Sequence, residues 1–242
     1  MKNLILFFVF SLFVAASFAQ SKDGKRYVIS ISKPAFHKQI YYLNGMWCPE
    51  EKAIAQAQKV ANTLQQDLSL IYSESELEGK KTPKKAKKAD ILRAFLWGCG
   101  FPPKATDSLT NALYNTLQNN DTALIYAHSR GAFITYYAIN RVAKKLGKTH
   151  QKALLSNIYV VTIGGYAPRI HRWNRKIHLV MIVNEYDLVP FLAGNGAKGS
   201  HVKNVSTKVH SLNSYLPYLL QLAEISKIKL FSRKKYSHLS DF

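Results

Sequence analysis

The chain has 242 residues, a formal net charge of +20 and a hydrophobic fraction of 47%. This length suits one α/β domain and is too short for two such domains once a targeting segment is set aside. The excess of lysine and arginine predicts nonspecific attraction to anionic partners such as lipid headgroups or acidic polymers. The two cysteines, Cys48 and Cys99, are too few for a zinc site built from four cysteines.

The first stretch, MKNLILFFVFSLFVAASFAQ, has the layout of a secretory signal peptide. Lys2 precedes an apolar segment, and Ser17 and Ala19 are the small residues expected before a cleavage site. We expect residues 1–19 to be removed and residues 20–242 to form one exported domain, periplasmic or secreted. An uncleaved anchor is the alternative, because this segment could only just span a bilayer.

The two cysteines have two interpretations in an exported protein. An oxidising compartment would allow Cys48 and Cys99 to form one disulfide. Cysteine also packs as a small apolar residue, so two buried free thiols are the other interpretation.

Short β-rich apolar runs alternate along the chain with longer stretches of helical period. This alternation predicts an α/β fold with a mainly parallel central sheet and helices on both faces. The predicted strands are 26–32, 39–44, 68–72, 123–127, 158–164 and 177–183.

A crossover helix is predicted between the second and third strands, within 49–68. Pro49 suits the first helical turn, and Glu50 and Glu51 complement the helix N-terminus. Apolar residues at helical spacing predict the face that packs on the sheet; they are Ile54, Ala57, Val60, Ala61 and Leu64.

A lysine-rich insertion occupies about 78–90, where the sequence reads EGKKTPKKAKKAD. It has no apolar face to bury, so we expect an exposed loop, with a clamp for an anionic surface as the functional alternative. Nucleic-acid binding predicts aromatic side chains interleaved with the basic ones as stacking platforms. This stretch has none, so we expect no specific nucleic-acid partner.

The segment LIYAHSRGAF, residues 124–133, joins a buried strand to a helix through Ser129 and Gly131. A helix is predicted from about Ala132 to Leu146, and its N-terminal amides aim at the serine. Strand and helix nearly touch at such a turn, so small residues are needed two places before and after the serine. Ala127 and Gly131 meet this requirement.

This arrangement resembles the nucleophile elbow of α/β-hydrolases, G-x-S-x-G, with Ala127 replacing the first glycine. The resemblance implies an α/β-hydrolase fold in which Ser129 is the catalytic nucleophile. A serine hydroxyl needs a base to take its proton, and an acid to orient that base. In this fold the acid and then the base follow the serine along the chain.

Asp187 is the predicted acid, because it follows the β-rich run 177–183 and few carboxylates come after Ser129. Glu185 is the alternative acid. His210 is the predicted base, on a loop after a short strand within 202–209 and before a helix that carries Leu212, Tyr215, Leu216 and Leu219. His201 is the alternative base, and His238 lies too close to the C-terminus.

Three further histidines are expected to lie outside the catalytic set. His128 should pack beside the site, because neighbouring side chains on an elbow diverge. His171 and His178 precede the acid and are expected at the surface.

The tetrahedral intermediate of acyl transfer needs hydrogen-bond donors for its oxyanion. One donor is expected to be the backbone amide of Arg130, which follows the serine. The other is expected from the loop YYLNGMWCP. There Gly45 has no side chain, so the backbone can approach substrate, and Met46 supplies the amide.

The resemblance extends to VVTIGGYAPRI and IHLVMIVNEYDLVPFL, which are similar to the corresponding segments of class 3 lipases. It implies hydrolysis of a lipid or small-molecule ester through an acyl-enzyme, with no metal or organic cofactor. The positive surface would hold such an enzyme near an anionic membrane. The alternative is a non-catalytic basic protein on the same scaffold, binding anionic lipid or polymer, in which Ser129 is buried or unable to meet His210.

Overall fold

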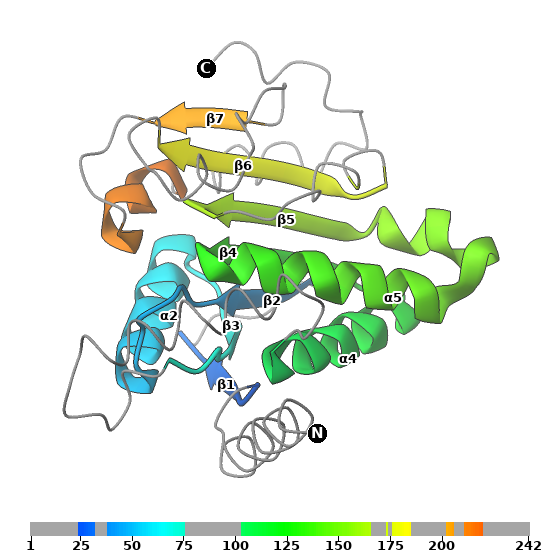
Figure 1. Ribbon diagram of the computed structural model, residues 1–242, viewed down its shortest axis with the longest axis horizontal. Coiled ribbons are helices and arrows are strands. Elements are labelled where there is room, and N and C mark those ends of the chain that lie inside the picture. Colours follow the sequence, from blue (N-terminus) through cyan, green and yellow to red (C-terminus); the bar gives the residue numbers. More distant parts are fainter. Residues whose placement is uncertain are drawn as a thin grey trace, which may run out of the picture.

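The computed structural model describes residues 24–31, 38–75, 103–165, 173, 176–184, 202–205 and 211–219 (Figure 1). The predicted signal peptide, the lysine-rich insertion and Cys99 lie outside these residues. The helices and strands are, in chain order, β1 (Arg26–Ile29), β2 (Lys38–Leu43), α2 (Glu50–Leu64), β3 (Leu68–Ile71), α4 (Lys104–Gln118), β4 (Thr122–His128), α5 (Arg130–Leu155), β5 (Ile158–Ile163), β6 (His178–Asn184) and β7 (Val202–Val205). A short helix at 212–219 follows.

Within the described ranges, seven strands form one sheet in the order β1-β3-β2-β4-β5-β6-β7. Every pairing from β3 to β7 is parallel, whereas β1 pairs antiparallel with β3 at one edge. The six predicted strands and the mainly parallel sheet are therefore confirmed. The strand predicted within 202–209 is present as β7 and ends at Val205.

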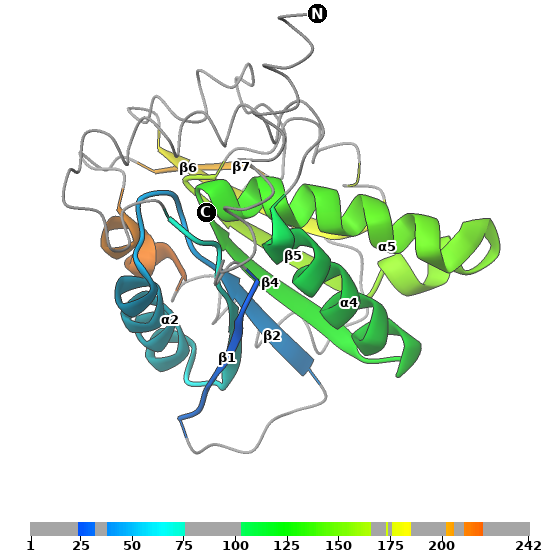
Figure 2. The same ribbon diagram turned by 60° about the horizontal axis from the view of Figure 1, so that its bottom comes forward.

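Helices cover both faces of this sheet, which makes the described part of the chain an α/β fold (Figure 2). Helices α4 and α5 pack on one face, while α2 and the helix at 212–219 pack on the other. The buried side chains accordingly fall into two clusters. The first contains Leu109, Leu113, Ile134 and Ile139, and the second contains Val60, Leu64, Tyr215 and Leu219.

Strand β4 runs through the middle of the sheet and contributes alternately to the two clusters. Ala123, Ile125 and Ala127 belong to the cluster under α4 and α5, whereas Leu124 and Tyr126 belong to the cluster under α2. This alternation follows from the two-residue period of a strand. Both faces are covered, which explains why the sequence of β4 reads as one continuous apolar run.

Helix α2 carries Glu50 and Glu51 in its first turn, as predicted, whereas Pro49, which was expected in that turn, precedes the helix as its N-cap. It ends at Leu64. Gln65 follows as the C-cap with a left-handed φ of 54°, and its backbone N–H donates to the carbonyl oxygens of Ala61 and Asn62. The buried face differs from the predicted one at one position. Ala53 is fully buried, and Ile54 is only partly buried at the edge of the cluster.

Helix α5 is longer than predicted and is kinked. Gly147 lies inside it with φ 67° and ψ 168°, so one helical segment ends there and a second continues to Leu155. The positive φ favours glycine at this position. The predicted apolar face is buried at Ala132, Ile139, Ala143 and Leu146, while Tyr136 is partly buried against the same cluster.

Helix α4 was not predicted, and its signal is present in the sequence. Pro103 precedes it, Asp107 stands in its first turn, and Leu109, Leu113 and Leu117 recur at helical spacing and are fully buried. Among the described helices, none is long and apolar enough to cross a membrane.

Candidate active site at the carboxyl ends of β2 and β4

The order of the strands creates a switch point between β2 and β4. From β2 the chain passes to β3 on one side, and it later returns to place β4 on the other side of β2. The helices that follow these two strands, α2 and α5, cover opposite faces. In open α/β sheets, ligands bind at the carboxyl ends of the strands that flank such a point. The loop after β2 and the turn after β4 are therefore the first place to look for a site.

Ser129 forms the turn between β4 and α5 and has an unusual backbone conformation, φ 50° and ψ −114°. A non-glycine residue rarely adopts positive φ, and doing so costs about 1–3 kcal/mol. The surrounding structure holds it in place. The backbone N–H of Ser129 donates to the carbonyl oxygen of Ile163 at 2.9 Å. The carbonyl oxygen of Ser129 accepts from the N–H of Ala132 at 3.1 Å.

Close packing around the turn explains its small residues. A Cβ atom built on Gly131 would lie 2.8 Å from Cβ of Leu43 on β2 and 2.9 Å from its carbonyl oxygen. A Cβ atom on Gly165, after β5, would lie 2.7 Å from that of Ala132. The helix start is therefore packed tightly between β2 and the residue after β5. Gly131 is tightly packed, but the nearest atoms belong to Leu43 on β2 rather than to β4, the strand that precedes the serine.

The loop after β2 lies against the serine turn. A Cβ atom on Gly45 would lie 3.2 Å from Cβ of Ser129 and 2.9 Å from Nδ1 of His128. The missing side chain therefore allows this loop to approach Ser129 and His128 closely, whereas the predicted approach of its backbone to substrate stays a prediction. Met46, the predicted second oxyanion donor, follows directly in this loop and is half-buried.

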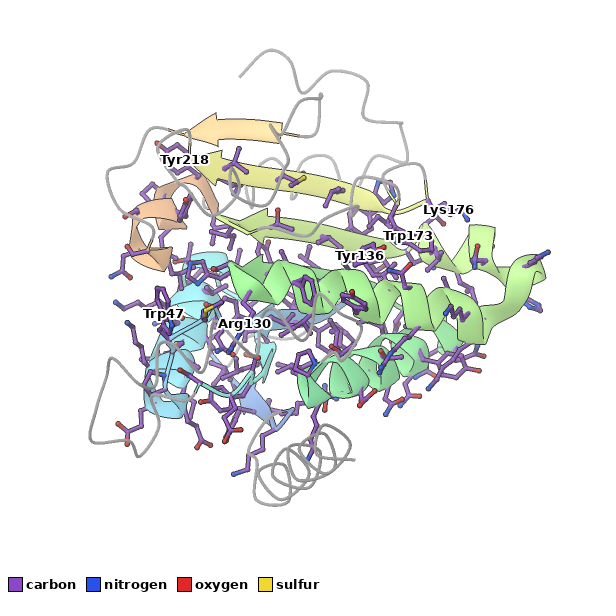
Figure 3. All side chains as sticks on the ribbon, viewed as in Figure 1. Trp47, Arg130, Tyr136, Trp173, Lys176 and Tyr218 are labelled. Atoms are coloured by element: carbon purple, nitrogen blue, oxygen red, sulfur yellow. The ribbon has the colours of Figure 1, made fainter. Side chains whose placement is uncertain are left out.

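Trp47 completes this loop and is unusual in two respects. It is 41% exposed, and its φ is 56°, which is a clear outlier for a bulky side chain. Figure 3 shows Trp47 and Arg130 at the same end of the sheet, on the turns that follow β2 and β4. Two strained residues, Trp47 and Ser129, thus belong to neighbouring loops at one edge.

The side chain of Arg130 is buried, with 5% of its surface exposed. Its Nη2 atom donates to the carbonyl oxygens of Ser73 at 2.7 Å and Glu74 at 3.0 Å, and it approaches that of Gly45 at 3.5 Å. The sequence analysis assigned a role only to the backbone amide of Arg130. Nothing in the local sequence shows where its side chain points, because the carbonyls that it meets come from two other loops.

Asn44, at the end of β2, is a second residue that the sequence analysis missed. Its amide nitrogen donates to the carbonyl of Ser73 at 2.8 Å, and its amide oxygen accepts from the N–H of Ser73 at 2.8 Å. The same nitrogen also donates to the carbonyl of Gly45 at 3.0 Å. The signal for it is a polar residue at the end of an otherwise apolar strand.

The other predicted site residues lie outside the described ranges. They are Asp187 and its alternative Glu185, and His210 and its alternative His201; His238, which was set aside as a base, lies outside them too. Their assignment as acid and base therefore stays a prediction. His128 is buried beside Gly45, as expected for a packing role, and His178 is at the surface, where its ring stacks on Tyr159 at 4.2 Å. His171 is also outside the described residues.

Cys48 lies close to the loop after β2 but has the properties of a packing residue. It is a buried free thiol, and burial raises its pKa from 9.0 to about 11. The thiol is therefore protonated at neutral pH, which is the unreactive form. In the part of the chain that the structure describes, no group of three or more His, Cys, Asp or Glu side chains is placed to hold a metal ion.

The exposure of Ser129 bears on what this site does. Only 8% of its surface is accessible to solvent, although the turn itself stands at the edge of the sheet.

No protein-family model matches this chain, and no curated protein matches it at a significant level.

Proposed function

We propose that this protein is a serine hydrolase of carboxylic esters with an α/β-hydrolase fold. The observation that carries the proposal is the backbone of Ser129, φ 50° and ψ −114°, at a tight turn between a central strand and a helix. A turn of this kind costs free energy and lifts the serine side chain to the edge of the sheet. Strain of this type concentrates at functional sites, where the surrounding structure maintains it.

The surroundings of the serine support the same function. The oxyanion donors of this fold are the amide after the nucleophile and an amide from the loop between an earlier strand and its helix. Here these are the amides of Arg130 and Met46. The approach of Gly45 to Ser129 supports a role for that loop, because it brings the backbone before Met46 against the serine.

In the proposed mechanism, Ser129 attacks the ester carbonyl while His210 takes its proton, and Asp187 orients the histidine. His210 then gives the proton to the alcohol, and departure of the alcohol leaves an acyl-enzyme. In the second half of the reaction, His210 takes a proton from water, which attacks the acyl-enzyme. The carboxylic acid product leaves as the proton returns to Ser129. The oxyanion formed in each half is stabilised by the two backbone amides.

We expect a fluorophosphonate probe to label the purified protein covalently. Ser129→Ala should abolish labelling and lower kcat for a soluble aryl ester by about a millionfold. The matched control is Ser156→Ala, because Ser156 is an exposed serine at the far end of α5. Labelling of Ser129→Ala at the wild-type rate would contradict the proposal.

The base is tested by a second matched pair, His210→Ala and His201→Ala. If His210 takes the proton, only the first variant should lose labelling and turnover. The reverse result would transfer the role of base to His201. Retention of activity in both would reject a histidine base at either position.

The burial of Ser129 favours a second candidate function. A non-catalytic basic protein on this scaffold has no need of an accessible serine, and the net charge of +20 suits anionic lipid or polymer. This function predicts no fluorophosphonate labelling of the folded wild type. It also predicts binding to vesicles of phosphatidylglycerol, but not of phosphatidylcholine, that weakens as salt is added.

A further inference from the structure

Three loops meet at the buried guanidinium of Arg130. Ser73 and Glu74 follow β3, Gly45 follows β2, and Arg130 itself follows β4. Two of its hydrogen bonds, to Ser73 and Glu74, are short, and the contact with Gly45 is the longest at 3.5 Å. The side chain thus joins the serine turn directly to the loop after β3.

Asn44 extends this connection to the loop after β2. The carbonyl oxygen of Ser73 accepts from both Arg130 and Asn44, at 2.7 and 2.8 Å. The amide oxygen of Asn44 accepts from the N–H of Ser73, and its nitrogen also donates to Gly45. The network therefore runs from Arg130 through Ser73 and Asn44 to Gly45, next to Met46.

A buried guanidinium is costly unless its protons meet acceptors, and Nη2 of Arg130 meets the carbonyl oxygens of Ser73 and Glu74. Hydrogen bonds from a charged donor are roughly twice as strong as those between neutral groups. These bonds come from Nη2, which belongs to a rigid planar group, unlike the flexible ammonium of lysine. Arg130 is therefore well suited to hold one loop at a set distance from another.

We propose that the side chain of Arg130 is a positioning residue that fixes the loop 44–47, and with it the Met46 amide, relative to Ser129 before substrate binds. The inference rests on the proposed serine hydrolase function. Oxyanion donors lower the barrier only if they already point at the place where charge will develop. A donor on an unsupported loop would have to be ordered during the reaction, and that cost would appear in kcat.

The variants Arg130→Met and Arg130→Lys test this role, with Arg141→Met as the matched control. Arg141 lies on the same helix, is exposed and pairs with Asp107. For Arg130→Met we expect kcat to fall by about 100-fold, as for the loss of one oxyanion donor. KM for a soluble aryl ester should change by less than about threefold, because the ground state makes little use of these donors. Arg130→Lys should recover part of the loss, and Arg141→Met should match the wild type.

A trifluoromethyl ketone separates positioning from general destabilisation. The serine oxygen adds to its carbonyl and forms a tetrahedral oxyanion, so its affinity should fall by the same factor as kcat/KM. All values are normalised to the concentration of serines that react with the fluorophosphonate. A merely structural role would lower the melting temperature while leaving kcat per reactive serine and inhibitor affinity unchanged.

Hydrogen exchange provides a readout that does not depend on activity. Amide exchange in 44–47 should accelerate in Arg130→Met, and it should stay at the wild-type rate in Arg141→Met. If Arg130→Met does not fold, the same comparison is made with Arg130→Lys.

Three outcomes would overturn the proposal. Unchanged exchange in 44–47 together with unchanged kcat in a folded Arg130 variant rejects the inference and leaves the hydrolase function intact. A loss that appears only in KM also rejects it, because the residue would then act on binding. Failure of the folded wild type to react with the fluorophosphonate removes the proposed function, and the inference with it.

Discussion

Ser129 is held in a backbone conformation that its own side chain disfavours. The turn is maintained by the bonds from its N–H to Ile163 and from Ala132 to its carbonyl, and by the packing of Gly131 against β2. The strain is therefore balanced by contacts with strands β2 and β5 and with the first turn of α5. Its cost can be measured, because glycine adopts the same φ without penalty.

We expect Ser129→Gly to be more stable than Ser129→Ala by about 1 kcal/mol in the free energy of unfolding. Both variants lack the hydroxyl, so the comparison isolates the backbone. Urea denaturation followed by circular dichroism gives the difference. A more stable alanine variant would mean that the turn imposes no strain on residue 129.

The residues that determine this turn were readable from the sequence, whereas their supports were not. The small residues on either side of Ser129 are common in strand-to-helix turns, and the apolar strand before them and the helical period after them made the turn predictable. Asn44 and the side chain of Arg130 were missed, because their partners are backbone carbonyls of loops distant in sequence. Asp187 and His210 were chosen from chain order and from their places beside predicted strands, and they stay predictions.

Helix α5 contains two glycines with different structural roles. Gly131 lies where the helix begins and has no room for a side chain, whereas Gly147 has open space around it and a positive φ. The first allows close packing at the site, and the second allows the kink. Substitution by alanine should therefore have different effects at the two positions.

Gly131→Ala should lower the free energy of unfolding by about 1–3 kcal/mol and slow fluorophosphonate labelling, because the added methyl group displaces the helix start. Gly147→Ala should lose roughly 1–2 kcal/mol to backbone strain and keep the wild-type labelling rate. Both quantities are obtained from urea titrations and timed labelling of the two variants. Equal labelling rates would show that the site tolerates movement of the helix start.

Element by element, the parallel strands were predicted well because their apolar runs are bounded by polar residues. The antiparallel pairing of β1 could not be predicted, because an edge strand presents the same side chains to each face of the sheet in either direction. Helix α4 was not predicted, although Leu109, Leu113 and Leu117 recur in it at helical spacing. The kink in α5 depends on the φ of one glycine, which the sequence does not specify.

The two clusters across the sheet give the molecule a dependence on pH at the alkaline end. Burial raises the pKa of the phenols of Tyr41, Tyr42 and Tyr126, and that of the Cys48 thiol to about 11. In the unfolded chain these groups ionise near pH 9 to 10. At neutral pH these groups are therefore protonated in both the folded and the unfolded chain, and their ionisation takes nothing from the free energy of unfolding.

We expect the free energy of unfolding to decline as the pH rises above about 9, because the unfolded chain then releases protons that the folded chain retains. Tyr126→Phe keeps the ring and removes one such group, so its decline should be shallower. Urea midpoints at a series of alkaline pH values test this. A wild-type midpoint independent of pH up to 11 would contradict the burial of these groups.

The alternating contribution of β4 to both sides of the sheet makes that strand intolerant of changes in length. Inserting or deleting one residue between Thr122 and His128 would exchange the sides, sending Tyr126 toward space shaped for alanine. The same slip would turn Ser129 through half a turn relative to Gly45. Homologous chains that keep this site should therefore accommodate insertions and deletions elsewhere, and the distance in residues from the start of β4 to the serine should not vary.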